Sequence, residues 1–345
     1  MNYDSIRNLL FLLPAEAAHH LSLQSIALLD RLNLTSLVAR DVPGDPVDVM
    51  GIRFPNPVGL AAGLDKNATC IEGMAAMGFG FIEVGTVTPK AQAGNPKPRL
   101  FRLTARNALI NRMGFNNEGV EAMAKRIKRS GFKGVLGINI GKNASTPVED
   151  ALSDYEFCMR KVYQLASYIV VNISSPNTPG LRNLQRQQEL EALLDGLQKV
   201  HGELKAKYDK HVPLVVKIAP DMDDDEVIDI ANCLLAHHID GVVVTNTTVS
   251  RSAVYGERHS DEAGGLSGAP LKNQANHVLK LVADHVQGAM TVIGVGGIMS
   301  AEDAVEKLRL GADLVQIYTG FIFKGPALVS ESVAQISAYR HSLAR

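Results

Sequence analysis

The chain has 345 residues, of which 46% are hydrophobic and 21% charged, so it is long enough for one large α/β barrel or two ordinary domains and too apolar to be disordered. Lys and Arg (35) nearly balance Asp and Glu (36), which argues against a nucleic-acid partner. Cys70, Cys158 and Cys233 lack the C-x-x-C spacing of metal or redox sites. We therefore expect buried, reduced thiols in a reducing compartment, and no metal centre.

Residues 1–40 are expected to form an amphipathic helical extension. Pro14 and Glu16 divide its apolar sequence, and Asp30 with Arg31 ends the second apolar run. Each run is shorter than the ~20 residues that span a bilayer, and the features of a signal peptide are absent. We expect two short helices joined at Pro14. The second helix carries an apolar stripe of Leu21, Ile26, Leu28, Leu29 and Leu32. Such a stripe suits either a membrane interface or packing on the main domain, and the pattern alone favours packing.

A Pro- and Gly-rich stretch at residues 43–46 is expected to link this extension to a main domain of residues 41–345. The next segment, PVDVMGIRFPNP at residues 46–57, predicts a small β-hairpin. If the main domain is a barrel, this hairpin is placed to plug the N-terminal end of the barrel.

Eight short apolar runs rich in Val and Ile follow, each succeeded by Gly or polar residues and then by a segment of helical period. They lie at residues 57–63, 81–87, 134–141, 168–175, 213–220, 241–248, 291–297 and 314–320. Eight buried-type strands that alternate with helices favour a parallel sheet closed on itself over a doubly wound open sheet. The predicted fold class is α/β, a (β/α)8 TIM barrel.

In such barrels the active site forms at the C-terminal ends of the strands. The residues there are amides, hydroxyls, glycines and two lysines, Lys66 and Lys217, with only Asp65 as a nearby carboxylate. That set is poor for acid–base hydrolysis and for divalent metals. The glycines after the last two strands, followed by a helix expected to open near Lys324, favour a phosphate site, although a Gly pair also makes a plain tight turn.

A series of motifs runs through the whole chain in a recognisable order. They are LAAGLDKN (60–67), EVGTVTP (83–89), NPKPRLFRL (95–103), NRMGFNN (111–117), VNISSPNTPGLR (171–182), VVKIAPD (215–221), TNTT (245–248), GLSGAPL (265–271), GVGGI (294–298) and QIYTG (316–320). Together they resemble the dihydroorotate dehydrogenase family. The N-terminal extension, and Ser175 where the cytosolic class carries cysteine, are similar to its second, membrane-associated and quinone-dependent class.

The resemblance implies oxidation of dihydroorotate to orotate, with electrons passed through FMN to a membrane quinone, in de novo pyrimidine (UMP) biosynthesis. It implies no iron–sulfur subunit. It also implies peripheral association with the cytoplasmic side of the cell inner membrane of a bacterium. A bacterial source is further favoured because no Arg- and Ser-rich transit peptide precedes the extension.

The resemblance also implies which residues hold FMN along the strand ends. They are Ala61, Ala62, Gly63, Lys66, Thr86, Asn139, Asn172 and Thr245 near the isoalloxazine, and Gly268, Gly297, Tyr318 and Thr319 around ribityl and phosphate. Lys217 is expected beside the pyrimidine edge, where a cation stabilises the anionic reduced flavin. Without the family, Lys217 is equally a Schiff-base lysine or the structural partner of an acidic neighbour such as Asp221.

For the substrate, the resemblance implies that Lys66 pairs with the carboxylate of dihydroorotate, surrounded by amides and their neighbours. These are Asn111, Arg112, Met113, Gly114, Phe115, Asn172, Asn177, Asn246 and Thr247. Each asparagine alone is as well explained as a turn residue. Ser175 is expected to remove the C5 proton while C6 gives hydride to flavin N5, with a proton relay that involves Thr178, since serine is a weak base. Without the family, Ser175 is a turn hydroxyl before Pro176.

Arg102, Tyr318 and His19 are implied to line the route to the quinone. This shifts the balance for the extension toward the membrane, because a lipid-soluble acceptor needs an apolar entrance. His19 as an ordinary surface histidine stays the alternative.

Two other functions stay open from the residues alone, namely a lyase that uses Lys217 as a Schiff base on a phosphorylated substrate and a membrane-binding protein without activity. Colour separates them, since only a flavoprotein is yellow.

Overall fold

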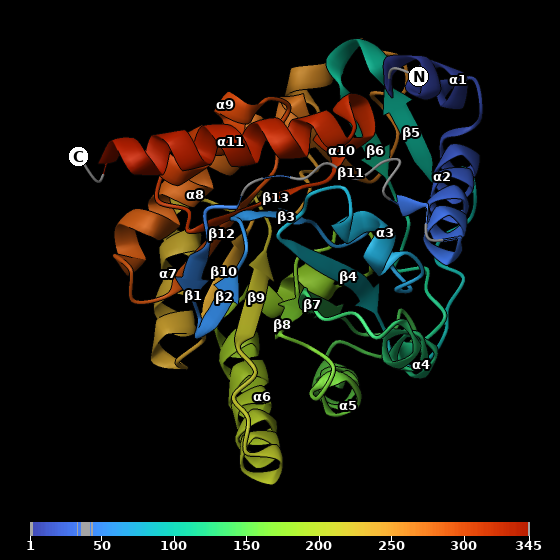
Figure 1. Cartoon of the computed structure of the whole chain (residues 1–345). Helices are drawn as coiled ribbons and strands as arrows, with labels where there is room; N and C mark the ends of the chain where they lie inside the picture. Colours follow the sequence, from blue (N-terminus) through green and yellow to red (C-terminus); the bar gives the residue numbers. More distant parts are fainter. Residues whose placement is uncertain (1–2, 33, 36–41, 43, 344–345) are drawn as a thin grey trace.

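The computed structural model describes residues 3–32, 34–35, 42 and 44–343, and its centre is a closed parallel barrel (Figure 1). The order around the barrel, β10-β12-β13-β3-β4-β7-β8-β9, follows the order along the chain. Each of the eight predicted runs forms one barrel strand, which confirms the (β/α)8 fold. These strands are β3 (Val58–Leu60), β4 (Phe81–Val87), β7 (Val135–Ile140), β8 (Tyr168–Asn172), β9 (Leu214–Ile218), β10 (Gly241–Val244), β12 (Thr291–Val295) and β13 (Leu314–Ile317).

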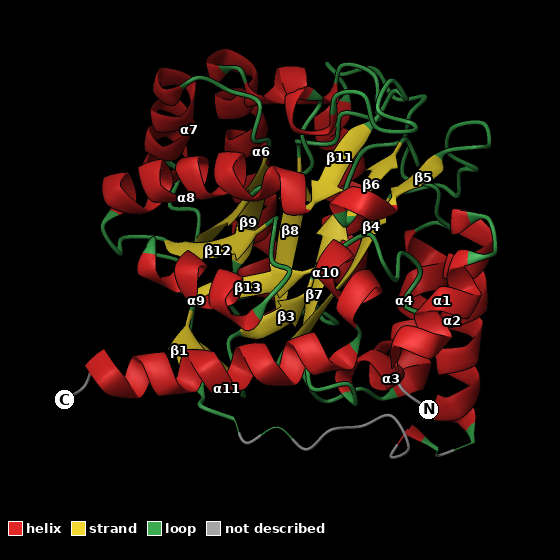
Figure 2. Ribbon diagram, turned by 90° about the horizontal axis from the view of Figure 1, so that it is seen from above, coloured by secondary structure: helices red, strands yellow, loops and turns green. Residues whose placement is uncertain are grey.

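Helices surround the strands, as the view in Figure 2 shows. Their apolar faces pack on the outward side chains of the strands and form the largest core cluster. Local sequence fixes some helix starts: Asp223 and Glu226 form a reciprocal capping box at the start of α7. The helices are α3 (Ile71–Ala75), α4 (Val120–Ser130), α5 (Ala151–Val162), α6 (Gln187–Tyr208), α7 (Asp224–Ala236), α8 (Lys272–Val286), α9 (Ala301–Arg309), α10 (Thr319–Lys324) and α11 (Pro326–Leu343).

The predicted hairpin forms and closes the N-terminal end of the barrel. Strands β1 (Val47–Val49) and β2 (Ile52–Phe54) pair antiparallel. Phe54 is fully buried, and its ring packs edge-on against Phe81 with 5.1 Å between the ring centroids. Apolar side chains from the hairpin and the barrel strands thus fill the N-terminal half of the barrel. Between this apolar layer and the C-terminal end, the barrel strands carry buried polar side chains such as Glu83, Asn139 and Lys217.

A second sheet, which the sequence did not predict, lies beyond the C-terminal ends of the strands. Strands β5 (Leu100–Leu103), β6 (Ala108–Asn111) and β11 (Gly265–Gly268) are antiparallel in the order β11-β6-β5. Phe101, Ile110 and Leu266 contribute to a small separate core beneath them. This sheet brings Asn111 and Gly268, which are far apart in the chain, to the same end of the barrel. Short 3₁₀ helices interrupt the loops at Thr104–Arg106, Leu181–Gln185, Ser252–Val254 and Ala269–Leu271.

The N-terminal extension forms the two predicted helices, α1 (Tyr3–Phe11) and α2 (Ala15–Arg31), which meet at Pro14. Both are anchored to the barrel. The Tyr3 hydroxyl donates to the carbonyl of Ile322 at 2.7 Å, and the buried Arg99 pairs with Glu16 of α2 at 2.8 Å.

Among the described helices, none is long and apolar enough to cross a bilayer. Residues 36–41 and 43, which include the expected domain boundary and the start of the expected linker, lie outside the described residues.

The structure corrects the predicted apolar stripe of α2. Leu21, Leu28 and Leu32 share one face and are 45%, 56% and 57% exposed. Ile26 lies on the opposite face, against Gly73 of the helix α3. Ile26 and the three exposed leucines therefore belong to two surfaces, because a separation of five residues places Ile26 roughly 140° from Leu21 around the helix axis. One face packs on the barrel, and the other is exposed together with Leu9 and Leu12, which are 68% and 81% exposed.

Candidate active site

A large open cavity lies at the C-terminal ends of the barrel strands, and we call it the strand-end cavity. Its empty volume, which includes open solvent at the mouth, is about 990 Å³. Most of the residues expected at the site line it. They are Ala61, Ala62, Gly63, Lys66, Thr86, Asn111, Met113, Gly114, Phe115, Asn172, Ser175, Asn177, Lys217, Thr245, Asn246, Thr247, Gly268, Gly297, Tyr318 and Thr319.

Two of the residues expected to hold FMN or the substrate, Arg112 and Asn139, do not line the strand-end cavity. The guanidinium of Arg112 pairs with Glu262 at 2.6 Å and lies 4.7 Å from the ring centroid of Phe101. The side chain of Asn139 is buried beneath the cavity, where its oxygen accepts hydrogen bonds from Thr86 at 2.5 Å and Asn172 at 3.2 Å. Asn139 therefore orients two lining residues, whereas Arg112 packs on the covering sheet.

Sequence analysis missed a buried carboxylate inside the barrel. Glu83 is fully buried and accepts hydrogen bonds from Asn139 at 2.8 Å, from the Tyr168 hydroxyl at 3.2 Å and from Gln316. Its signal was present, since Glu83 is the one charged residue in the otherwise buried run 81–87. Asp65, the carboxylate noted from the sequence, instead accepts from the backbone N–H groups of Thr69 and Cys70, both at 2.9 Å.

Two lysines line the cavity, of which Lys217 is buried and Lys66 is half-buried. Burial lowers the pKa of Lys217, and Glu83 opposes that shift. The pair between Lys217 and Asp221 is not present, because Asp221 pairs with Arg182 at 2.8 Å. Burial, reinforced by Arg99, lowers the pKa of Lys66 to about 8. Both ammonium groups are therefore easier to deprotonate than a surface lysine, and an anionic ligand would restore their charge.

Ser175 and three asparagines form one wall of the strand-end cavity. The Ser175 hydroxyl oxygen accepts a hydrogen bond from the backbone N–H of Asn177 at 3.3 Å, which is the turn contact expected without the family. The Asn177 amide donates to Asn111 at 3.2 Å, and Asn246 donates to the Ser174 hydroxyl at 3.0 Å. The Thr178 hydroxyl is buried and has no partner among the described residues. Ser175 thus combines its turn contact with a position in the cavity wall.

The glycine end of the cavity has the backbone geometry that only glycine adopts easily. Gly297 has a φ of +79°, and a Cβ there would lie 2.3 Å from the Cα of Lys272. Thr319 and Gly320 line the same cavity. The following helix, α10, begins at Thr319 and ends at Lys324, so the expected opening near Lys324 was wrong.

A second cavity, the helix-side cavity, lies between the extension and the barrel. Its empty volume, which includes open solvent, is about 710 Å³, and its lining is largely apolar, with Phe11, Leu23 and Phe321 among the residues. His19, Arg102 and Tyr318 line it together, and Tyr318 also lines the strand-end cavity. Tyr318 is therefore part of the wall between the two cavities.

Burial shifts the pKa values of the polar side chains that line the helix-side cavity. Burial, together with Lys66, lowers the pKa of His19 to about 3, so the imidazole is neutral at neutral pH. The Arg102 guanidinium lies 4.5 Å from the ring centroid of Phe11 and donates to the carbonyl of Leu13. Burial raises the pKa of Tyr318 to about 12. His19 is half-buried in the wall of the helix-side cavity, so it does not have the environment of a solvated surface histidine, which was the alternative for this residue.

Comparison with known proteins gives one consistent result. The family model described as dihydroorotate dehydrogenase matches residues 46–339. A protein of Marinomonas sp. (strain MWYL1) named dihydroorotate dehydrogenase (quinone) is 55% identical over 99% of this chain and 99% of its own. One of Pseudomonas fluorescens (strain Pf0-1) with the same name is 54% identical over 98% and 100%. The crystal structure of DHODH from Eimeria tenella in complex with ferulenol has a TM-score of 0.88 at 37% identity, covering 95% of this chain and 92% of that one.

Proposed function

The chain belongs to the dihydroorotate dehydrogenase family, and from this premise we propose that its two cavities each serve one half of the reaction. The chain is an oxidoreductase of pyrimidine biosynthesis that oxidises dihydroorotate and uses a quinone as electron acceptor. The observation that carries the division is Tyr318, which lines both a polar cavity and an apolar one. Dihydroorotate would react in the strand-end cavity, and the quinone would enter through the helix-side cavity.

FMN suits the strand-end cavity. The backbone at Gly296, Gly297 and Gly320 leaves room and N–H groups for a phosphate at one end. At the other end Lys217 supplies a buried cation, and the Gln316 side-chain oxygen lacks a partner among the described residues and can accept from a ring N–H. When bound, FMN supplies the hydride acceptor. Thr86, Asn172 and Thr245 complete the lining expected to hold it, and Asn139 supports two of them from below.

The residues of this chain would then bind and deprotonate the substrate. Lys66 would pair with the carboxylate, and the amides of Asn111, Asn172, Asn177 and Asn246 would match its N–H and C=O edges. Ser175 would accept the C5 proton at its hydroxyl oxygen while its own proton leaves. The buried, unpartnered Thr178 hydroxyl supports its role as the next group in that relay.

The extension would deliver the quinone and hold the protein on a membrane. The helix-side cavity has an apolar lining and three polar side chains, Arg102, Tyr318 and the neutral imidazole of His19. These three side chains can hydrogen-bond to a quinone carbonyl. The exposed leucines of α1 and α2 support peripheral insertion into the bilayer interface, expected at the cytoplasmic side of a bacterial inner membrane. In this division residues 1–40 form the quinone entrance and residues 41–345 the catalytic barrel.

An anaerobic titration tests the proposed function. The purified protein should be yellow, bleach on addition of dihydroorotate and regain colour on addition of a quinone. A colourless protein that borohydride traps covalently with a phosphorylated carbonyl compound would instead support the Schiff-base lyase at Lys217.

A further inference from the structure

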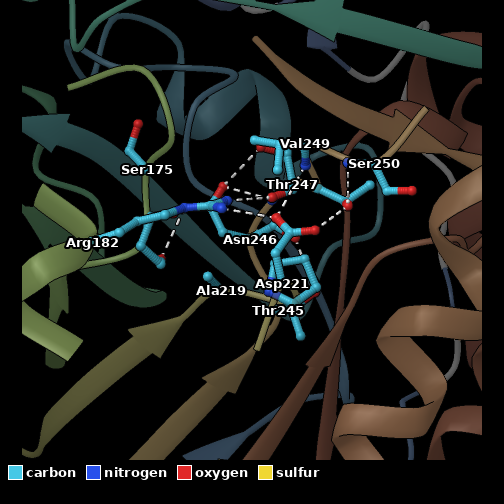
Figure 3. A network of polar contacts seen from close by, with 12 residues as sticks. Ser175, Arg182, Ala219, Asp221, Thr245, Asn246, Thr247, Val249 and Ser250 are labelled. Carbon is cyan, nitrogen blue, oxygen red and sulfur yellow. Dashed lines mark hydrogen bonds and ion pairs between the residues drawn. The ribbon is translucent and has the colours of Figure 1, made fainter. Parts of the chain in front are cut away.

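Three loops at the C-terminal end of the barrel meet at one guanidinium. Arg182 donates from Nε to the carbonyl of Ser174 at 3.0 Å and from Nη2 to the carbonyl of Thr247 at 2.9 Å. Its Nη1 donates to Asp221 at 2.8 Å. Figure 3 shows these contacts converging on the Arg182 side chain. The loops after β8, β9 and β10 are thereby tied together by a single residue.

Asp221 extends the same junction on its other side. One carboxylate oxygen accepts from the backbone N–H of Val249 at 3.0 Å, and the other accepts from the Thr248 hydroxyl and from Gln274 of α8 at 3.2 Å. The side chains of Arg182 and Asp221 are only 23% and 15% exposed. Solvent screening is therefore weaker than for a surface pair, and the charge-assisted hydrogen bonds are correspondingly stronger.

The junction reaches Ser175 through the residue before it. Ser174 is held at its carbonyl by Arg182 and at its hydroxyl by Asn246, which donates at 3.0 Å. Neither Arg182 nor Asp221 lines the strand-end cavity, and neither side chain contacts Ser175 among the described hydrogen bonds. Any effect of the pair on the reaction is therefore indirect.

We propose that the Arg182–Asp221 pair is a positioning device that sets the Ser175 hydroxyl relative to the substrate-binding amide Asn246. This inference rests on the proposed role of Ser175 as the base. A planar guanidinium directs N–H donors from three different nitrogens to three separate acceptors in a fixed geometry, whereas the three donors of a lysine share one nitrogen. Because a misplacement of ~1 Å costs on the order of 10²-fold in rate, loss of the fork should be seen mainly in proton removal.

A double-mutant cycle on the FMN-loaded full chain tests the proposal. The rate of flavin reduction by dihydroorotate is measured anaerobically for Arg182→Gln, Ser175→Ala and the double variant. Arg182→Gln should slow reduction on the order of 10²-fold in the wild-type background, but less than ~3-fold when Ser175 is already alanine. Orotate affinity should change less than ~5-fold, since Lys66 and Asn111 come from other loops and would still hold the ligand, although Asn246 and Thr247 lie on a loop that Arg182 holds. Equal slowing in both backgrounds would mean that Arg182 only supports the fold, and would overturn the proposal.

Three further variants keep the result decisive. Arg182→Lys retains the contact with Asp221 but loses the fork, so its rate should fall between those of wild type and Arg182→Gln. If Arg182→Gln does not fold, Asp221→Asn replaces it in the same cycle with the same expected non-additivity. Arg160→Gln is the matched control, because Arg160 pairs with Glu156 and Glu203 on outer helices at 2.8 and 2.6 Å, and its rate should match wild type. If Ser175→Ala itself reduces at the wild-type rate, the proposed function of Ser175 fails rather than the junction alone.

Discussion

Replacing Glu16 by glutamine should loosen the extension from the barrel without disturbing the strand-end cavity. The Glu16 and Arg99 side chains are 11% and 7% exposed, and they approach to 2.8 Å. Removing one partner of a buried pair typically costs 3–5 kcal/mol. Here Arg99 keeps two carbonyl acceptors, at Ala93 and Asn95, and the new amide oxygen still accepts a hydrogen bond. We therefore expect a loss of about 2–3 kcal/mol of docking free energy.

The assay compares protease cleavage of the extension with the two half-reactions. Glu16→Gln should be cleaved faster within residues 15–31 and oxidised more slowly by quinone, while flavin reduction by dihydroorotate is retained. Lys97→Gln is the matched control, because Lys97 lies 3.5 Å from the same carboxylate but is 65% exposed, and such pairs contribute about 0–1 kcal/mol. Equal effects of Glu16→Gln and Lys97→Gln would contradict the claim that the buried Glu16–Arg99 pair holds the extension on the barrel.

The same pair gives the extension a pH dependence. Hydrogen bonds and charge from Arg99 hold the pKa of Glu16 below its ordinary value, although burial acts in the opposite direction. The stabilisation is therefore complete above the pKa of the unfolded state and is lost as the pH falls through the lower folded-state value. Protease cleavage of wild-type protein should approach that of Glu16→Gln only in this acidic range.

Two other variants test the strand-end cavity. Ser175→Ala should stay yellow yet be reduced by dihydroorotate about 10²- to 10⁴-fold more slowly near neutral pH, since it removes a positioned base, and unchanged stopped-flow reduction would sink the assignment. Lys66→Ala should weaken orotate binding by about 1.5–3 kcal/mol through loss of a charge-assisted hydrogen bond, measured by flavin difference spectra. In wild type, orotate affinity should fall as the pH rises through about 8, where the cation of free Lys66 is lost; a Lys66→Ala variant with wild-type affinity at neutral pH contradicts the pairing.

The barrel could be predicted from the sequence because its signal is local. Each strand is a short run such as YIVV or GVVV, bounded by Gly or polar residues, and the active-site end follows from the direction of the strands. The β5-β6-β11 sheet could not be predicted in this way. Its strand β11 reads GLSG, which has little strand propensity, and the sheet depends on pairing Gly265 with Asn111 far away in the chain.

The missed parts of the site have the same cause. Glu83 is revealed as a hub only when Asn139, Tyr168 and Gln316 from three other strands close around it. Arg112 was placed in the site because it lies in the motif NRMGFNN, but its partner Glu262 becomes adjacent only in the folded chain. Ile26 was placed in one stripe with the leucines because the pattern of a broad apolar stripe does not say which part of it meets α3.

Stopped-flow measurement of both half-reactions on a chain that lacks residues 1–38 tests the division between the two cavities most directly. All barrel strands and the glycine turns lie downstream, so FMN binding and reduction by dihydroorotate should survive. Oxidation by a long-tailed quinone should fall sharply, and so should co-sedimentation with lipid vesicles, because the helix-side cavity and the exposed leucines are removed. If quinone oxidation and vesicle binding both persist at the full-length level, the extension is only a packing element, and the assignment of the helix-side cavity to the quinone is contradicted.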